Sequence, residues 1–181
     1  MARLCKILFS LALLSFLIFT RTSAQATISA STTGHVIAEI IPVFSASETA
    51  QLNFGRFAPG PQGGKLILTP QSNISVLGSV YKGTGSHNAA SFYVSGDVDA
   101  AFSISLPSEP VILEHTSTSK TMLIEEWFSD PAPGIGAGML QNGFQVVFVG
   151  ATLNVGTMND NPVGIYTGSY TITFDLSLIH I

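Results

Sequence analysis

The sequence has little that could cross-link it or bind anions. Cys5 is its only cysteine, and seven Lys and Arg residues stand against eleven Asp and Glu residues in 181 positions. A lone cysteine forms no disulfide within the chain, so stability must come from a single apolar core. Because phosphate binding depends on clustered basic side chains, nucleic acid and anionic membranes are poor partners for this chain.

The first 26 residues have the pattern of a secretory signal peptide. Arg3 and Lys6 precede an apolar run over residues 7–19, and small residues follow it. Cleavage after Ala24 or after Ala26 fits the small-x-small rule. An uncleaved anchor is the alternative, but the run is shorter than the roughly 20 apolar residues that a bilayer span needs. We therefore expect no membrane span in the mature chain.

Cleavage would define the mature protein as residues 27–181. It would remove Cys5 and three of the seven basic residues, leaving four basic against eleven acidic side chains and a formal charge of -7. The expected location is the periplasm, the outer cell surface or the medium. A chain of this length is enough for one domain with its own core.

Alternation with a period of two dominates the mature chain. From Tyr166 to Leu178 the even positions are almost all apolar or aromatic, and a second alternating stretch runs from Phe92 to Leu106, with a bulge or hairpin at Gly96-Asp97. Further strands are predicted at 36–44, 65–70, 74–80, 109–115, 120–128 and 144–155, while "DPAPGIGAG" at 130–138 is predicted to be a flexible loop. No helix is indicated. The sequence predicts an all-β antiparallel sandwich of about eight strands.

The cluster "FAPGPQGGK" at 57–65 resembles a phosphate-binding loop only superficially. Such a loop needs glycine where Pro59 stands and Ser or Thr where Leu66 stands. We instead predict a turn in which the prolines fix φ and Gly60, Gly63 and Gly64 allow the chain to reverse.

Four blocks in order resemble one known family. "LNFGRFAPGPQGGKLILTP" (52–70), "AASFYVSGDVDAAFSISLP" (89–107), "VGATLNVG" (149–156) and "VGIYTGSYTITF" (163–174) are similar to successive motifs of the bacterial secreted domain of unknown function 4402. Two features depart from the family pattern: Ala151 replaces a glycine, and the chain ends in "DLSLIHI". The motif residues are Leu52, Phe54, Gly55, Phe92, Gly96, Gly150, Leu153, Gly156, Gly164, Tyr166 and Gly168.

The resemblance implies an immunoglobulin-like sandwich exported by a Gram-negative bacterium, and it implies no activity. The motifs are also distantly similar to subunits of bacterial fimbriae and spore-coat-type pilins, which donate an N-terminal strand to the next subunit. The candidate donor here is residues 27–44. The alternative is that this segment is the first strand of its own domain. The apolar residues of the candidate donor are Ile28, Ala30, Val36, Ile37, Ile40 and Ile41.

No residue pattern predicts catalysis, a metal or a cofactor. The four histidines are scattered, and no nucleophile motif is present. We therefore expect a non-enzymatic, exported structural or adhesion protein whose partners are itself or other surface subunits. The alternative hypothesis is a module that binds glycan or calcium, carried by Trp127, Tyr93, Asp97 and Asp99.

Overall fold

The computed structural model describes residues 28–40 and 43–176. The chain divides into two compact units at Glu39/Ile40. We call residues 28–40 the N-terminal segment; it contains no strand, and all its residues are exposed. The prediction of a strand over 36–44 was therefore wrong for the described part of that range. The predicted leader (1–26) and the C-terminal "SLIHI" (177–181) lie outside the described residues.

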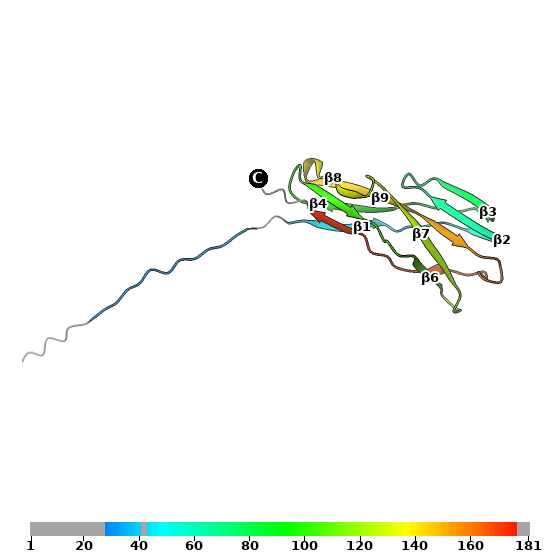
Figure 1. Ribbon diagram of the computed structural model, residues 1–181, viewed down its shortest axis with the longest axis horizontal. Coiled ribbons are helices and arrows are strands. Elements are labelled where there is room, and N and C mark those ends of the chain that lie inside the picture. The colour runs from blue at the N-terminus through cyan, green and yellow to red at the C-terminus, as the bar shows by residue number, and fades with distance from the viewer. Residues whose placement is uncertain (1–27, 41–42, 177–181) are drawn as a thin grey trace, which may run out of the picture. The chain divides into compact units, whose positions relative to one another are not determined.

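The second unit is built from antiparallel strands in two sheets (Figure 1). The large sheet has the order β1-β4-β9-β7-β6-β10, and β2 joins it by pairing with β9 and β3. The small sheet has the order β11-β5-β8. The strands of the large sheet are β1 (Ser45–Ala50), β2 (Phe57–Leu68), β3 (Ile74–Lys82), β4 (Ala90–Ser95), β6 (Val111–His115), β7 (Thr121–Asp130), β9 (Phe144–Val155) and β10 (Tyr166–Thr167), and those of the small sheet are β5 (Ala101–Ser105), β8 (Gly134–Met139) and β11 (Thr173–Leu176).

The prediction of an all-β antiparallel, sandwich-like fold is confirmed. The only helix in the described residues is a 3₁₀ turn, η1 (Gln141–Gly143). Strand β9 is the centre of the large sheet, since β4 and β2 share one of its edges and β7 takes the other. The described residues form eleven strands instead of about eight, because two long alternating stretches each divide between the two sheets and because the predicted loop at 130–138 contains strand β8.

The core consists of two apolar clusters on the inner face of the large sheet. One cluster lies between the sheets and joins Val147 and Val149 of β9 to Phe102 and Ile104 of β5. The other lies over β2, β7 and the end of β9, around Leu66. No strand of the small sheet contributes a residue to this second cluster, and apart from Leu52 the residues packed around it come from strands of the large sheet itself. One half of the large sheet is therefore covered less completely than the other.

The predicted terminal strand is two short strands joined by an unpaired stretch. β10 pairs with β6 in the large sheet, and β11 pairs with β5 in the small sheet. Residues 168–172 between them belong to no strand, although Tyr170 and Ile172 remain more buried than their odd-numbered neighbours. The alternation was read correctly, but a single continuous strand was wrong because an extended chain keeps its period while it crosses from one sheet to the other.

The Gly/Pro cluster is not a reversal, so that prediction was also wrong. It lies within β2, where the register with β3 moves from Pro59↔Val80 to Gly64↔Gly78. The extra residues form a bulge. Glycine is required because a Cβ atom at Gly60 or Gly64 would overlap atoms of β3.

The predicted loop "GIGAG" is strand β8, paired with β5 at the edge of the small sheet. The strand was not predicted because glycine has a low propensity for β-strands. Gly138 lies on the ring of Phe102, and a Cβ atom there would overlap the ring. A close approach between backbone and aromatic ring thus explains this glycine.

Candidate assembly groove

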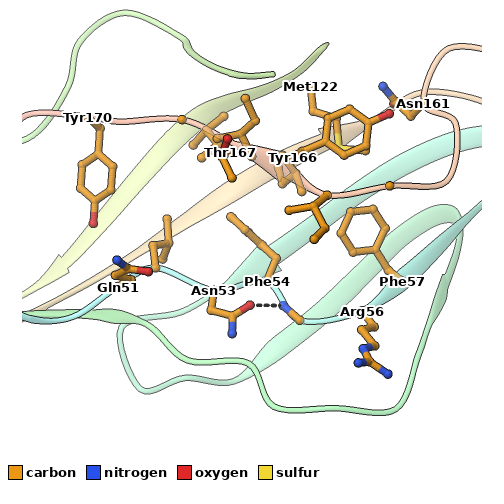
Figure 2. A pocket seen from close by; sticks show the side chains of 18 of the residues that line it. Gln51, Asn53, Phe54, Arg56, Phe57, Met122, Asn161, Tyr166, Thr167 and Tyr170 are labelled. Carbon is orange, nitrogen blue, oxygen red and sulfur yellow. Dashed lines mark hydrogen bonds between the residues drawn. The ribbon is translucent and has the colours of Figure 1, made fainter. Parts of the chain in front are cut away.

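An open groove crosses the less covered half of the large sheet. It has a volume of about 1240 Å³ and runs between two extended stretches, residues 51–59 and 162–170, which we call the first and second walls (Figure 2). Its floor is made of core residues: Leu113 from β6, Met122 and Ile124 from β7, and Leu153 from β9. The groove therefore opens directly onto the hydrophobic core.

The first wall is hydrogen-bonded along one edge. Asn53 exchanges two backbone hydrogen bonds with Asn88, both 2.9 Å long. Successive residues of an extended chain direct their backbone groups to opposite edges, so those of Leu52 and Phe54 face away from Asn88. In the described part of the chain, no backbone hydrogen bond outside the strands involves either residue. Their side chains pack on the core clusters.

The second wall is positioned by a compact turn after β9. The Asp160 carboxylate accepts hydrogen bonds from the hydroxyl (2.7 Å) and the amide (3.1 Å) of Thr157. These bonds lower the pKa of Asp160, so its charged form belongs to the folded turn. Asn161 is buried; its amide donates to the carbonyl of Thr121 (2.7 Å), and its side-chain oxygen accepts from the amide of Gly156. The turn is thereby tied to the start of β7.

His115 holds the same wall from below. Its Nδ1 accepts hydrogen bonds from the amides of Ser117 (3.0 Å) and Thr118 (3.1 Å). Because both amides are donors, the proton of the neutral ring is on Nε2, which donates to the carbonyl of Val163 (3.2 Å). The ring also meets Tyr166 edge to face, with centroids 4.9 Å apart. His115 ends strand β6, and this arrangement gives its buried ring a structural role whose hydrogen-bond partners the sequence did not reveal.

Two buried polar atoms, one of them from a residue that lines the groove, have no partner. The hydroxyl of Tyr170 and Nε1 of Trp127 are buried without a hydrogen bond in the described structure, and the two rings pack with centroids 4.7 Å apart. Burial, and secondarily the Glu48 carboxylate, raises the pKa of Tyr170 above the ordinary 10.0. In Figure 2 this hydroxyl points across the groove toward Gln51. A buried hydroxyl without a hydrogen-bond partner lowers the stability of the folded state, unless a bound molecule supplies that partner.

The motif residues gather around this groove. Eight of the eleven line it: Leu52, Phe54, Gly55, Phe92, Leu153, Gly164, Tyr166 and Gly168. The others permit close packing: a Cβ atom at Gly150 would overlap the carbonyl of Leu68, one at Gly156 would crowd Asp160, and one at Gly96 would crowd Leu140. Residues far apart in the sequence thus share one site, although the motifs alone gave no sign of a groove.

The candidate donor residues lie in the N-terminal segment. Ile28, Val36, Ile37 and Ile40 are each at least 94% exposed, and Ala30 is exposed as well. Ile41 lies outside the described residues. The alternative, in which this segment is the first strand of its own domain, is not what the described residues show, since the first strand is β1 at Ser45.

The structure does not bring the residues of the alternative site together. Trp127 lies opposite Ala151 and Tyr93 lies opposite Val146 on β9, which places their side chains on opposite faces of the large sheet. Trp127 packs on both core clusters, whereas Tyr93 stacks on Phe144 on the outer face. Within residues 28–40 and 43–176, no three His, Cys, Asp or Glu side chains are grouped as a metal site, and this includes Asp97 and Asp99.

Fold and groove together define a class of protein: an all-β antiparallel domain with an apolar groove along its core. Residues 44–175 match the family model named Domain of unknown function (DUF4402), so the chain belongs to this family. No curated protein matches the sequence. Among the described residues, no helix is long and apolar enough to cross a membrane.

Proposed function

We propose that this protein is a non-enzymatic, exported structural or adhesion protein that assembles at the cell surface by β-strand addition. One observation carries the proposal: the N-terminal segment presents four large apolar side chains that are almost fully exposed. Three of them, Val36, Ile37 and Ile40, lie within five residues of one another, and clustered exposed apolar side chains mark interaction sites in soluble proteins. An extended apolar segment is suited to add a strand to an incomplete sheet or groove.

The chemistry of the groove supports binding over catalysis. Its lining is apolar, amide or hydroxyl in character, and only Glu48 and Arg56 carry a charge. An active site for acid-base chemistry would require paired titratable groups converging on one point.

Export is supported by residues 1–26, which have the pattern of a secretory signal peptide. Sequencing the N-terminus of the exported chain tests this prediction, because the chain should start at Gln25 or Thr27.

Light scattering after gel filtration tests assembly. The chain from residue 27 onward should form species whose mass increases with concentration. A chain beginning at Ser45 keeps every strand of the domain and should elute as one small species. A peptide of residues 27–44 added to the short chain should bind it. A long chain that stays monomeric at all concentrations contradicts the proposal.

A further inference from the structure

We infer that the groove of one copy receives the N-terminal segment of a second copy, with the even-numbered side chains of that segment facing the groove floor. This inference rests on the proposed function and adds to it the partner, the acceptor site and the orientation. The partner is a second molecule of this chain. The occupant is a strand, because the groove is long, apolar and bordered by two extended walls.

The N-terminal segment has the alternation of a strand that buries one face. Its even positions are small or apolar except for one threonine, and its odd positions are polar except for Ile37. A strand inserted between two walls would direct one set toward the core and the other toward solvent. The even set is Ile28, Ala30, Thr32, Gly34, Val36, Ala38 and Ile40, and the odd set is Ser29, Ser31, Thr33, His35, Ile37 and Glu39.

The lengths are compatible. Each wall has nine residues, which span roughly 30 Å at about 3.3 Å per residue. The thirteen residues of the segment extend over about 43 Å on the same estimate. The segment is therefore long enough to run along the whole groove. Its more apolar half, from Val36 to Ile40, can then lie within the groove as well.

The walls offer backbone groups for such a strand. Leu52 and Phe54 direct theirs away from Asn88, and residues 168–172 of the second wall and its continuation belong to no strand. Unpaired backbone along a sheet edge is a template for another strand. At the same place, the buried hydroxyl of Tyr170 lacks a partner that the backbone of an inserted strand would supply.

A second copy fits better than the segment of the same chain. Only residues 41–44 separate the segment from β1, which leads directly into the first wall. If these four residues formed a hairpin loop, Ile40 would lie opposite Ser45, and the polar half, residues 29–34, would lie opposite 51–56. A parallel insertion is excluded because it needs a crossover of a dozen or more residues. The segment of a separate molecule can enter the groove in any register and in either direction, because no short connection ties it to β1.

Two neighbouring substitutions test the orientation. Val36→Asp and Ile37→Asp introduce the same charge at adjacent apolar positions that are 94% and 95% exposed, so neither should disturb the folded domain. V36D should raise the concentration needed for half-assembly at least tenfold, since it would bury a carboxylate, and I37D should have a much smaller effect. Equal effects of the two, or no effect of either, would overturn the inference while assembly itself, and hence the proposed function, could persist in the unmodified chain.

Disulfide trapping tests the acceptor and the partner. The expected mature chain has no cysteine, so introduced thiols react without background. One chain carries Ser169→Cys on the second wall, and another carries Thr33→Cys or His35→Cys, at positions of the outward set. Mixing and mild oxidation should give a crosslinked dimer, whereas Ser75→Cys, an exposed serine on β3 away from the groove, should give none. A monomeric disulfide in a chain that carries both cysteines, without intermolecular product, would show self-insertion and overturn the inference.

Discussion

At the scale of single residues, the conformational freedom of glycine matters less here than its lack of a side chain. Gly150 lies in β9 against β2, and a Cβ atom would come within 2.1 Å of the carbonyl oxygen of Leu68. Backbone atoms cannot move aside as a side chain can. The adjacent Ala151, which departs from the family motif, points the other way, and its methyl group is fully buried in the core. The departure is therefore accommodated by the packing.

We expect Gly150→Ala to lower the free energy of unfolding by about 1–3 kcal/mol, the usual range for overpacking. Urea unfolding followed by Trp127 fluorescence measures the change. Gly34→Ala is the matched control, because no atom lies within 4 Å of its added methyl group; it should stay within about 0.5 kcal/mol of the parent. Equal stability of the two variants would contradict the close approach in β9.

The phenol of Tyr170 makes stability depend on alkaline pH. Burial first, and then Glu48, raises its pKa in the folded state, so the unfolded chain releases this proton at lower pH. The unfolded state then binds fewer protons, and stability must fall as the pH rises above about 10. Tyr170→Phe should lessen this fall.

The same substitution removes a buried hydroxyl without a partner, so it should raise stability at neutral pH by about 1 kcal/mol. Denaturant titrations at pH 7 and pH 10.5 measure both effects. Tyr81→Phe, at a position that is 65% exposed, is the control and should change neither. A loss of stability in Tyr170→Phe at pH 7 would mean that the hydroxyl has a partner within the folded monomer.

At the scale of elements, the turn between β9 and β10 determines where the second wall lies. Asn161→Ala would leave the amide of Gly156 and the carbonyl of Thr121 without partners in a buried position. We expect a loss of about 1–3 kcal/mol in unfolding free energy and weaker binding of the 27–44 peptide. Asn159→Ala changes the same residue type at an exposed position of the same turn and should have little effect on either. If the two variants behave alike, the turn does not position the wall.

Strands rich in apolar and β-branched residues were predictable from the sequence. The prediction for 144–155 coincides with β9, the one for 74–80 falls within β3, and the one for 120–128 overlaps β7 in all but its first residue. The strand prediction failed at β8 and in the bulge of β2, where a glycine is present because the backbone approaches neighbouring atoms closely. Periodicity reports which side of the chain is buried, but it does not report which neighbour the backbone pairs with, so the division of the terminal stretch between two sheets could not be foreseen.

At the scale of the whole molecule, the proposed donor and the proposed acceptor differed in how far the sequence could predict them. The N-terminal segment was identified from its apolar residues, which need no partner to be recognised in the sequence. The groove was not, because its walls come from residues 51–59 and 162–170 and its floor from three strands between them. Tyr170 looked like any other inward residue of an alternating strand, and only the packing shows that its hydroxyl is unpaired.

The charge of the mature chain should make assembly depend on salt. If the predicted leader is removed, each copy carries a formal charge of -7, and in the described residues the one ion pair is Lys65–Glu125, at 3.7 Å. Copies of like charge repel one another, and salt screens this repulsion over a Debye length of about 10 Å at 0.1 M. The concentration for half-assembly should therefore fall as sodium chloride rises from about 0.05 to 0.3 M.

Glu109→Lys separates charge repulsion from a general effect of salt on apolar contacts. Glu109 is exposed and lies outside the groove, and the substitution makes the net charge less negative by two. It should strengthen assembly at low salt and flatten the salt dependence, whereas Glu109→Gln should have about half the effect. If assembly instead weakens as salt rises, attraction between opposite charges on the donor and the groove would drive it, and an apolar interface would no longer account for the assembly.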